Sequence, residues 1–181
     1  MKRYMLLATG GTIASVESGN GLRPGMGAQA LLDAVTLPDH IRVDGRDVFS
    51  LDSSNIQPEE WRVLAGEAYR ALQTYDGVVI THGTDTMAYT ASALSFMLPD
   101  LGKPVVLTGS QLPMGHPLSD AAVNFMEALA VVQQAPGGVY VAFHHKVIWG
   151  NRAVKMRTTA FDAFHSVNAP LAGVIDAEGV H

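Results

Sequence analysis

The sequence contains no cysteine, which excludes disulfide bonds, thiolate nucleophiles and cysteine-ligated zinc sites. No apolar run approaches the roughly 20 residues of a membrane-spanning helix. The apolar stretch behind Lys2 and Arg3 stops at Thr9, too early for a signal peptide. Basic residues are also scarce. The chain has 12 Lys and Arg and 17 Asp and Glu, which gives a net charge of -5. We therefore expect a cytoplasmic protein that binds neither nucleic acid nor membranes.

Metal-ligating patterns are also missing. The adjacent histidines His144 and His145 would point to opposite faces of a strand, and the other histidines show no ligand spacing. The sequence therefore predicts no metal site. What the chain does have is apolar residues: 48% of its 181 residues are apolar and 16% are charged, which suits one domain with a sizeable core.

Short apolar stretches alternate with helical segments along the chain. The expected strands cover residues 4–8, 48–51, 78–81, 105–108, 139–143, 147–149 and 172–175, and the expected helices cover residues 29–35, 58–72, 86–98 and 119–133. This alternation predicts an α/β fold, a three-layer domain with a mainly parallel sheet flanked by helices on both faces. Residues 15–27 are glycine-rich, and we expect a mobile loop there that could close over a ligand.

Two glycine-rich segments that contain threonine each follow an expected strand. They are ATGGTIAS at residues 8–15 and THGTDTM at residues 81–87. Ligands of parallel sheets bind at the carboxyl ends of the strands, where both segments would lie. Hydroxyls and free backbone N–H groups together favour acyl transfer, in which a hydroxyl attacks a carbonyl and the N–H groups hold the oxyanion.

Each of these features also has a simpler explanation when it is taken alone. The hydroxyl of Thr12 could be structural, and Asp85 could cap the following helix. The segment 52–55 (DSSN) could be a polar loop before a helix, and Lys155 could be a solvated surface charge. A dinucleotide-binding turn is less suitable, because the glycines match neither G-x-G-x-x-G nor a Walker A pattern.

Read in order, the motifs resemble the L-asparaginase family. TGGTIAS at residues 9–15 and HGTDT at residues 82–86 are similar to its two signatures. DSSN at 52–55, MAYTASALS at 87–95 and the segment from GKP at 102 to TGSQ at 108–111 resemble its cytoplasmic, type I branch. The similarity extends along essentially the whole chain.

The resemblance implies a reaction and a set of catalytic residues. Thr12 corresponds to the nucleophile that attacks the side-chain amide of L-asparagine, with L-glutamine as a second candidate substrate. Thr84, Asp85 and Lys155 correspond to the rest of the catalytic group. An aspartyl ester would form on Thr12 with release of ammonia, and water would then release L-aspartate without any cofactor.

The same resemblance implies the residues that bind the substrate. Asp52, Ser53 and Ser54 correspond to positions that hold the α-carboxylate and ammonium end, together with Thr84 and Asp85. The partner is thus a small molecule. Family members often carry a loop tyrosine that bonds the nucleophile, whereas this sequence has GLRP at residues 21–24.

The family usually has a smaller second domain that builds a dimer and completes the neighbouring subunit's site. This chain ends at His181, so we expect a single asparaginase-like N-terminal catalytic domain over residues 1–181, without that second domain. The resemblance also implies a homo-oligomer.

Two other functions stay open. The domain could hold aspartate or asparagine with weak or no catalysis, since the loop tyrosine is absent. It could instead be the asparaginase-like subunit of a tRNA-dependent amidotransferase, although its acidic composition offers no basic patch for tRNA.

Overall fold

The computed structural model describes residues 1–18, 21–100 and 102–181, and within them an eight-stranded sheet forms the centre of the molecule. The predicted α/β fold with a mainly parallel sheet is confirmed. The parallel part consists, in spatial order, of β4 (Ile41–Leu51), β1 (Lys2–Gly10), β5 (Gly77–Thr81), β6 (Pro104–Thr108) and β7 (Gly138–Phe143). Three antiparallel strands continue from β7: β8 (Lys146–Trp149), β11 (Gly173–Asp176) and β12 (Gly179–Val180).

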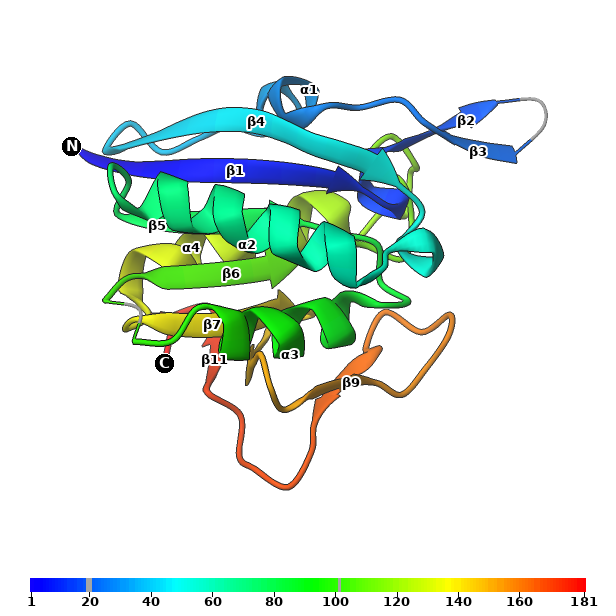
Figure 1. Ribbon diagram of the computed structural model, residues 1–181. Helices are drawn as coiled ribbons and strands as arrows, with labels where there is room; N and C mark the ends of the chain where they lie inside the picture. Colours follow the sequence, from blue (N-terminus) through cyan, green and yellow to red (C-terminus); the bar gives the residue numbers. More distant parts are fainter. Residues whose placement is uncertain (19–20, 101) are drawn as a thin grey trace.

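Helices cover both faces of the sheet, as predicted. α2 (Pro58–Leu72) and α3 (Met87–Met97) pack on one face, while α1 (Ala28–Asp33) and α4 (Ala121–Gln134) pack on the other (Figure 1). Alternate side chains of the buried strands supply the two cores: Val78 and Ile80 face α2 and α3, and Val79 faces the opposite layer. Among the described residues, none of these helices combines the length and the apolar character needed to cross a membrane.

The edge strand β4 is longer than the sequence predicted. It begins at Ile41 rather than Val48, and it pairs with β1 along nearly its whole length. Its early part carries charged residues, which indicate a loop when the sequence is considered alone. In the structure these charges lie at the solvent-facing edge, where Asp44 accepts hydrogen bonds from Arg42 and Arg3 at 2.9 Å each.

The glycine-rich segment after β1 is not an irregular loop, so that part of the prediction is wrong. β2 (Ser15–Ser18) and β3 (Gly21–Pro24) form an antiparallel ribbon that extends away from the sheet (Figure 1). Backbone pairing can hold such a ribbon without a packed core, which is why low apolar content did not prevent strands. Residues 19 and 20 lie outside the described residues, and closure of the segment over a ligand stays a prediction.

A second ribbon, absent from the sequence prediction, carries Lys155 to the site. β9 (Ala153–Lys155) pairs with β10 (Phe164–Ser166), and Lys155 lies opposite Phe164. Phe164 is buried and packs on Phe143 of β7 with ring centroids 4.9 Å apart. The aromatic pair anchors the ribbon to the sheet, and the ribbon thereby fixes the backbone from which the Lys155 side chain extends.

Glycine turns let the loops after β1 and β5 touch backbone to backbone. Gly11 has a φ of +81°, and a Cβ added to it would lie 2.4 Å from the backbone nitrogen of Gly83. A Cβ on Gly83 would lie 2.6 Å from the side chain of Ser53. Any side chain at these positions would force the loops apart, so glycine is required for the loops to meet.

Substitution of Gly11 by alanine should destabilise the fold. The alanine would combine an unfavourable positive φ with a clash against backbone that cannot rotate away, so we expect a loss of at least ~2 kcal/mol in the free energy of unfolding. Urea denaturation measures it. Gly115→Ala is the control, because no atom lies within 4 Å of the added Cβ. Equal unfolding midpoints for the two variants would contradict the proposed packing.

Candidate active site

A cavity of about 350 Å³ opens at the carboxyl ends of the parallel strands, a volume suited to a small molecule. The loops after β1, β4, β5 and β6 contribute to its wall, together with the end of β9. The lining residues are Gly11, Thr12, Ser15, Leu51, Asp52, Ser53, Gly83, Thr84, Asp85, Gln111, Lys155 and Thr158. Sequence segments separated by up to about 140 residues therefore meet there, as expected for a parallel sheet.

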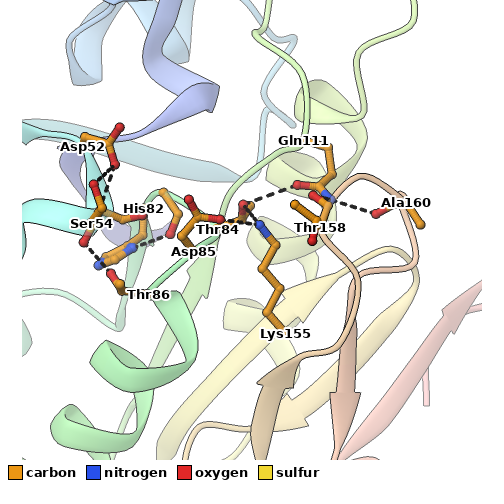
Figure 2. A network of polar contacts seen from close by, with 12 residues as sticks. Asp52, Ser54, His82, Thr84, Asp85, Thr86, Gln111, Lys155, Thr158 and Ala160 are labelled. Carbon is orange, nitrogen blue, oxygen red and sulfur yellow. Dashed lines mark hydrogen bonds and ion pairs between the residues drawn. The ribbon is translucent and has the colours of Figure 1, made fainter.

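Three of the predicted catalytic side chains are in direct contact. The Lys155 ammonium donates to Thr84 Oγ1 at 2.8 Å and to Asp85 Oδ1 at 2.6 Å (Figure 2). Lys155 is largely enclosed, with 13% of its side chain exposed, whereas the Asp85 side chain is 64% exposed. In such an arrangement the hydroxyl can act as a nucleophile or relay a proton, and the amine can act as a base. The carboxylate can hold the amine in position.

Asp85 does not cap the following helix. α3 begins at Met87, and its N-cap residue Thr86 makes no side-chain capping bond. The Thr86 hydroxyl instead donates to the carbonyl oxygen of Ser53 at 2.7 Å, which links the loop after β5 to the loop after β4. The Asp85 carboxylate accepts from Lys155 instead, so the capping alternative is wrong.

Thr12 lines the same cavity but stands apart from the bonded trio. It begins the short helix η1 (Thr12–Ala14), and its hydroxyl has no hydrogen-bond partner within the described parts of the chain. The neighbouring Thr9 differs, because it is buried and its hydroxyl donates to the carbonyl oxygen of Thr81 at 2.8 Å. Of these two threonines, only Thr12 lines the cavity.

The segment after β4 divides between the cavity and its support. Asp52 and the buried Ser53 line the cavity, whereas Ser54 is exposed and does not. The backbone N–H and hydroxyl of Ser54 donate to Asp52 Oδ1 at 2.9 and 2.8 Å (Figure 2). These bonds hold the pKa of Asp52 below its usual value, so the carboxylate is charged at neutral pH. Ser54 therefore orients Asp52 and does not itself reach the cavity.

His82, to which the sequence analysis assigned no role, is buried and supports the loop that contains Gly83. Its Nδ1 lies 2.7 Å from the carbonyl oxygen of Gly83, which can only accept, so Nδ1 carries the hydrogen. Its Nε2 then accepts from the hydroxyl of Thr90 at 2.9 Å, and Thr90 Oγ1 accepts from Trp61 Nε1 at 3.0 Å. Complete burial lowers the pKa of His82 to about 4 and keeps the ring neutral.

Gln111 and Thr158 are lining residues that the sequence analysis did not assign to the site. Gln111 follows the apolar strand β6, as the two threonine motifs follow β1 and β5. The same strand-end argument could therefore have identified it. Thr158 gives no such signal, because it follows the unpredicted ribbon strand β9. Among the described residues, no group of three His, Asp or Glu side chains is placed to hold a metal ion.

The fold and the site together define an α/β domain with a hydroxyl, amine and carboxylate site at the strand ends. The family model for the asparaginase N-terminal domain matches residues 3–181. The chain therefore belongs to the asparaginase family, which confirms the resemblance found in its motifs.

Individual relatives also match most of this chain. An L-asparaginase of Thermococcus kodakarensis is 43% identical over 170 residues, covering 93% of this chain and 52% of that protein. L-asparaginase 1 of Escherichia coli K12 is 42% identical over 176 residues, with the same two coverages. A glutamyl-tRNA(Gln) amidotransferase subunit of Sulfolobus acidocaldarius is 40% identical over 183 residues, covering 94% of this chain and 41% of that protein.

A solved structure of the thermostable L-asparaginase from Thermococcus kodakarensis superimposes with a TM-score of 0.93 at 41% identity. The match covers 98% of this chain and 55% of that one. The chain thus spans about half the length of the L-asparaginases that it resembles.

The neutral His82 should make stability depend on pH. Because its folded pKa is about 4 against 6.5 normally, the unfolded chain gains a proton there between these values while the folded chain does not. This group should therefore remove about 3 kcal/mol of stability as the pH falls through that window. We expect His82→Gln to lack this part of the loss in urea denaturation measured from about pH 7 to about pH 4. Parallel stability curves for the two proteins would contradict this assignment.

Proposed function

We propose that this domain hydrolyses the side-chain amide of L-asparagine to L-aspartate and ammonia, with Thr12 as the nucleophile. The observation that carries the proposal is the contact of Lys155 Nζ with Thr84 Oγ1 and Asp85 Oδ1, at 2.8 and 2.6 Å, in a cavity that Thr12 also lines. The names of the Thermococcus kodakarensis and Escherichia coli relatives support the same substrate.

In the proposed acylation, Thr12 Oγ1 forms a bond to the amide carbon while the carbonyl electron pair moves onto oxygen. Backbone N–H groups of the glycine-rich turns hold the oxyanion. Thr84 takes the proton of Thr12 and passes its own to Lys155, which acts as the neutral amine. The proton then returns to the leaving nitrogen, the C–N bond breaks and ammonia leaves an aspartyl ester on Thr12.

Deacylation follows the same path with water in place of Thr12. Lys155, through Thr84, takes a proton from the water as it attacks the ester carbon, and the proton goes back to Thr12 Oγ1 as the C–O bond breaks. One amide and one water thus yield aspartate and ammonia, and no cofactor enters the balance.

Charged and polar groups in the cavity wall would hold the amino acid end of the substrate. The charged Asp52 and the exposed carboxylate of Asp85 suit the α-ammonium group, and Ser53 suits the α-carboxylate. Ser54 contributes through its two hydrogen bonds to Asp52. L-glutamine differs by one methylene, which changes binding by only about 1–3 kcal/mol, so it is a second candidate substrate.

The organisation of the protein around this site is also proposed. Residues 1–181 would form the N-terminal catalytic domain of a cytoplasmic homo-oligomer. Because the chain spans about half the length of the L-asparaginases that it resembles, the activity of the whole protein is part of the proposal. Mass measurement in solution tests the oligomer directly.

A tRNA-dependent amidotransferase subunit is the second candidate, and the 40% identity to the amidotransferase subunit of Sulfolobus acidocaldarius favours it. With a net charge of -5, we expect no saturable binding of tRNA in a filter assay at physiological salt. Saturable binding at micromolar protein concentration would favour this candidate over the first.

The variant Thr12→Ala tests whether Thr12 is the nucleophile. Removal of the attacking hydroxyl in Thr12→Ala should lower the rate of ammonia release from L-asparagine by roughly three orders of magnitude or more. Thr36→Ala is the matched control, because that threonine is exposed and lies outside the cavity. Acid-quenched turnover followed by peptide mapping should locate the aspartyl ester on the peptide that contains Thr12.

Two results would count against this assignment. Full activity of Thr12→Ala would exclude Thr12 as nucleophile, and an ester mapped to Thr84 would move the role to that residue. Saturable binding of asparagine by calorimetry, without ammonia release over hours, would instead support a binding domain.

A further inference from the structure

The side chain of Gln111 is held in one orientation. Its Nε2 donates to the carbonyl oxygens of Thr158 and Ala160 at 3.0 and 2.8 Å, and its Oε1 lies 3.3 Å from Thr84 Oγ1 (Figure 2). Carbonyl oxygens can only accept, so both amide hydrogens are committed to residues 158 and 160. The amide oxygen must therefore face Thr84 as an acceptor.

The backbone of Gln111 is fixed as well. Its N–H group lies 3.0 Å from both carboxylate oxygens of Asp120, and the N–H group of Leu112 is 3.1 Å from Asp120 Oδ1. Asn124 Nδ2 donates to the same carboxylate at 3.0 Å and to the carbonyl oxygen of Gly109. α4 thus clamps the loop after β6, and the amide oxygen of Gln111 is presented to Thr84 by a rigid support.

This geometry gives the single hydroxyl hydrogen of Thr84 two competing acceptors. A charged Lys155 can only donate, so Thr84 Oγ1 accepts from it and directs its own hydrogen to Gln111 Oε1. A neutral Lys155 can accept, and the hydrogen can then turn toward Nζ. The proton relay needs the second arrangement, because Thr84 must give its proton to Lys155.

We propose that Gln111 is a positioning residue that holds the Thr84 hydroxyl hydrogen while Lys155 is charged and releases it when Lys155 becomes neutral. This inference rests on the proposed amidohydrolase function, in which Thr84 relays the proton. Thr84 must donate to Gln111 when Lys155 is charged, but it can donate to Nζ instead when Lys155 is neutral, so Gln111 favours the charged state. Gln111 would therefore set the pH at which the relay becomes active.

Opposite changes at Gln111 should shift this pH in opposite directions. Gln111→Met removes the acceptor with little change in length, so the titration midpoint of Lys155 should fall by about 0.4 to 1 pH unit, the equivalent of one hydrogen bond. Gln111→Glu places a carboxylate beside Thr84 and Lys155, so the midpoint should rise. A purely structural role would lower activity in both variants and leave the midpoint of Gln111→Met unchanged.

The other charged groups near Lys155 are the same in the unaltered chain and in the Gln111 variants. The titratable and charged side chains on the elements around it are Asp85, Asp52, Tyr89, Asp120, His165 and the Arg157–Asp162 pair. Their effects cancel when a Gln111 variant is compared with the unaltered chain, so the difference in midpoint belongs to position 111.

The test measures the Lys155 titration directly and does not depend on turnover. The chain has only four lysines, so ¹³Cε labelling gives a small set of NMR signals, and Lys155→Arg assigns the relevant one. In the Thr84→Val background the effect of Gln111→Met should vanish, because no hydroxyl remains to be held. An unchanged midpoint in Gln111→Met, or the same shift of that variant with and without Thr84, would overturn the proposal.

The pH profile of kcat/KM for ammonia release is the second measurement. Its rising limb should move to lower pH in Gln111→Met and to higher pH in Gln111→Glu. If the unaltered chain releases no ammonia, the proposed function fails, while the NMR titration still decides the role of Gln111. If Gln111→Met does not fold, Gln111→Leu replaces it, because the carboxylate of Gln111→Glu would raise the midpoint through its charge alone.

Discussion

The site depends on the close approach of loops that follow parallel strands. Gly11 touches Gly83, and Gly83 touches Ser53, so that three loops meet with almost no side chain between them. The cross-link from Thr86 to the carbonyl oxygen of Ser53 reinforces the same junction. A larger residue at Gly11 or Gly83 would force the loops apart and widen the cavity, even with every other side chain of the site unchanged. The glycines therefore determine the geometry of the site, even though they carry no side chain.

The sheet supplies most of the site, but the amine comes from elsewhere. Lys155 lies on a short ribbon whose partner strand contains the buried Phe164, so aromatic packing determines where the amine can reach. Enclosing a cation has a large desolvation cost unless it is paired, and Asp85 and Thr84 supply that pairing. The ribbon and the sheet are thus coupled through the Lys155 contacts, and loosening either would separate the amine of Lys155 from the hydroxyl of Thr84.

The sequence predicted those parts of the structure that depend on local pattern. Apolar runs such as residues 4–8 and 78–81 identified buried strands, and the two threonine motifs at their ends identified half of the residues that line the cavity. The charged start of β4 and the short strand β9 could not be predicted in this way. These segments are strands because they pair with residues far along the chain. That pairing cannot be inferred from a short stretch of sequence. Gln111 belongs between these cases, because its place after β6 was visible but its bonds to residues 158 and 160 were not.

The resemblance gave Asp85 two roles, one in the catalytic group and one in substrate binding, and the geometry leaves an oxygen for each. Its Oδ1 accepts from Lys155, and its Oδ2 has no hydrogen-bond partner among the residues that the structure describes. The carboxylate is 64% exposed while its lysine partner is 13% exposed, so the acid stays open to the cavity and the amine does not. One oxygen can orient the base while the other receives a substrate ammonium group. Under the proposed function, this carboxylate at the boundary between enclosed and open space would join substrate binding to the proton relay, as long as the loop after β5 and the ribbon hold it in place.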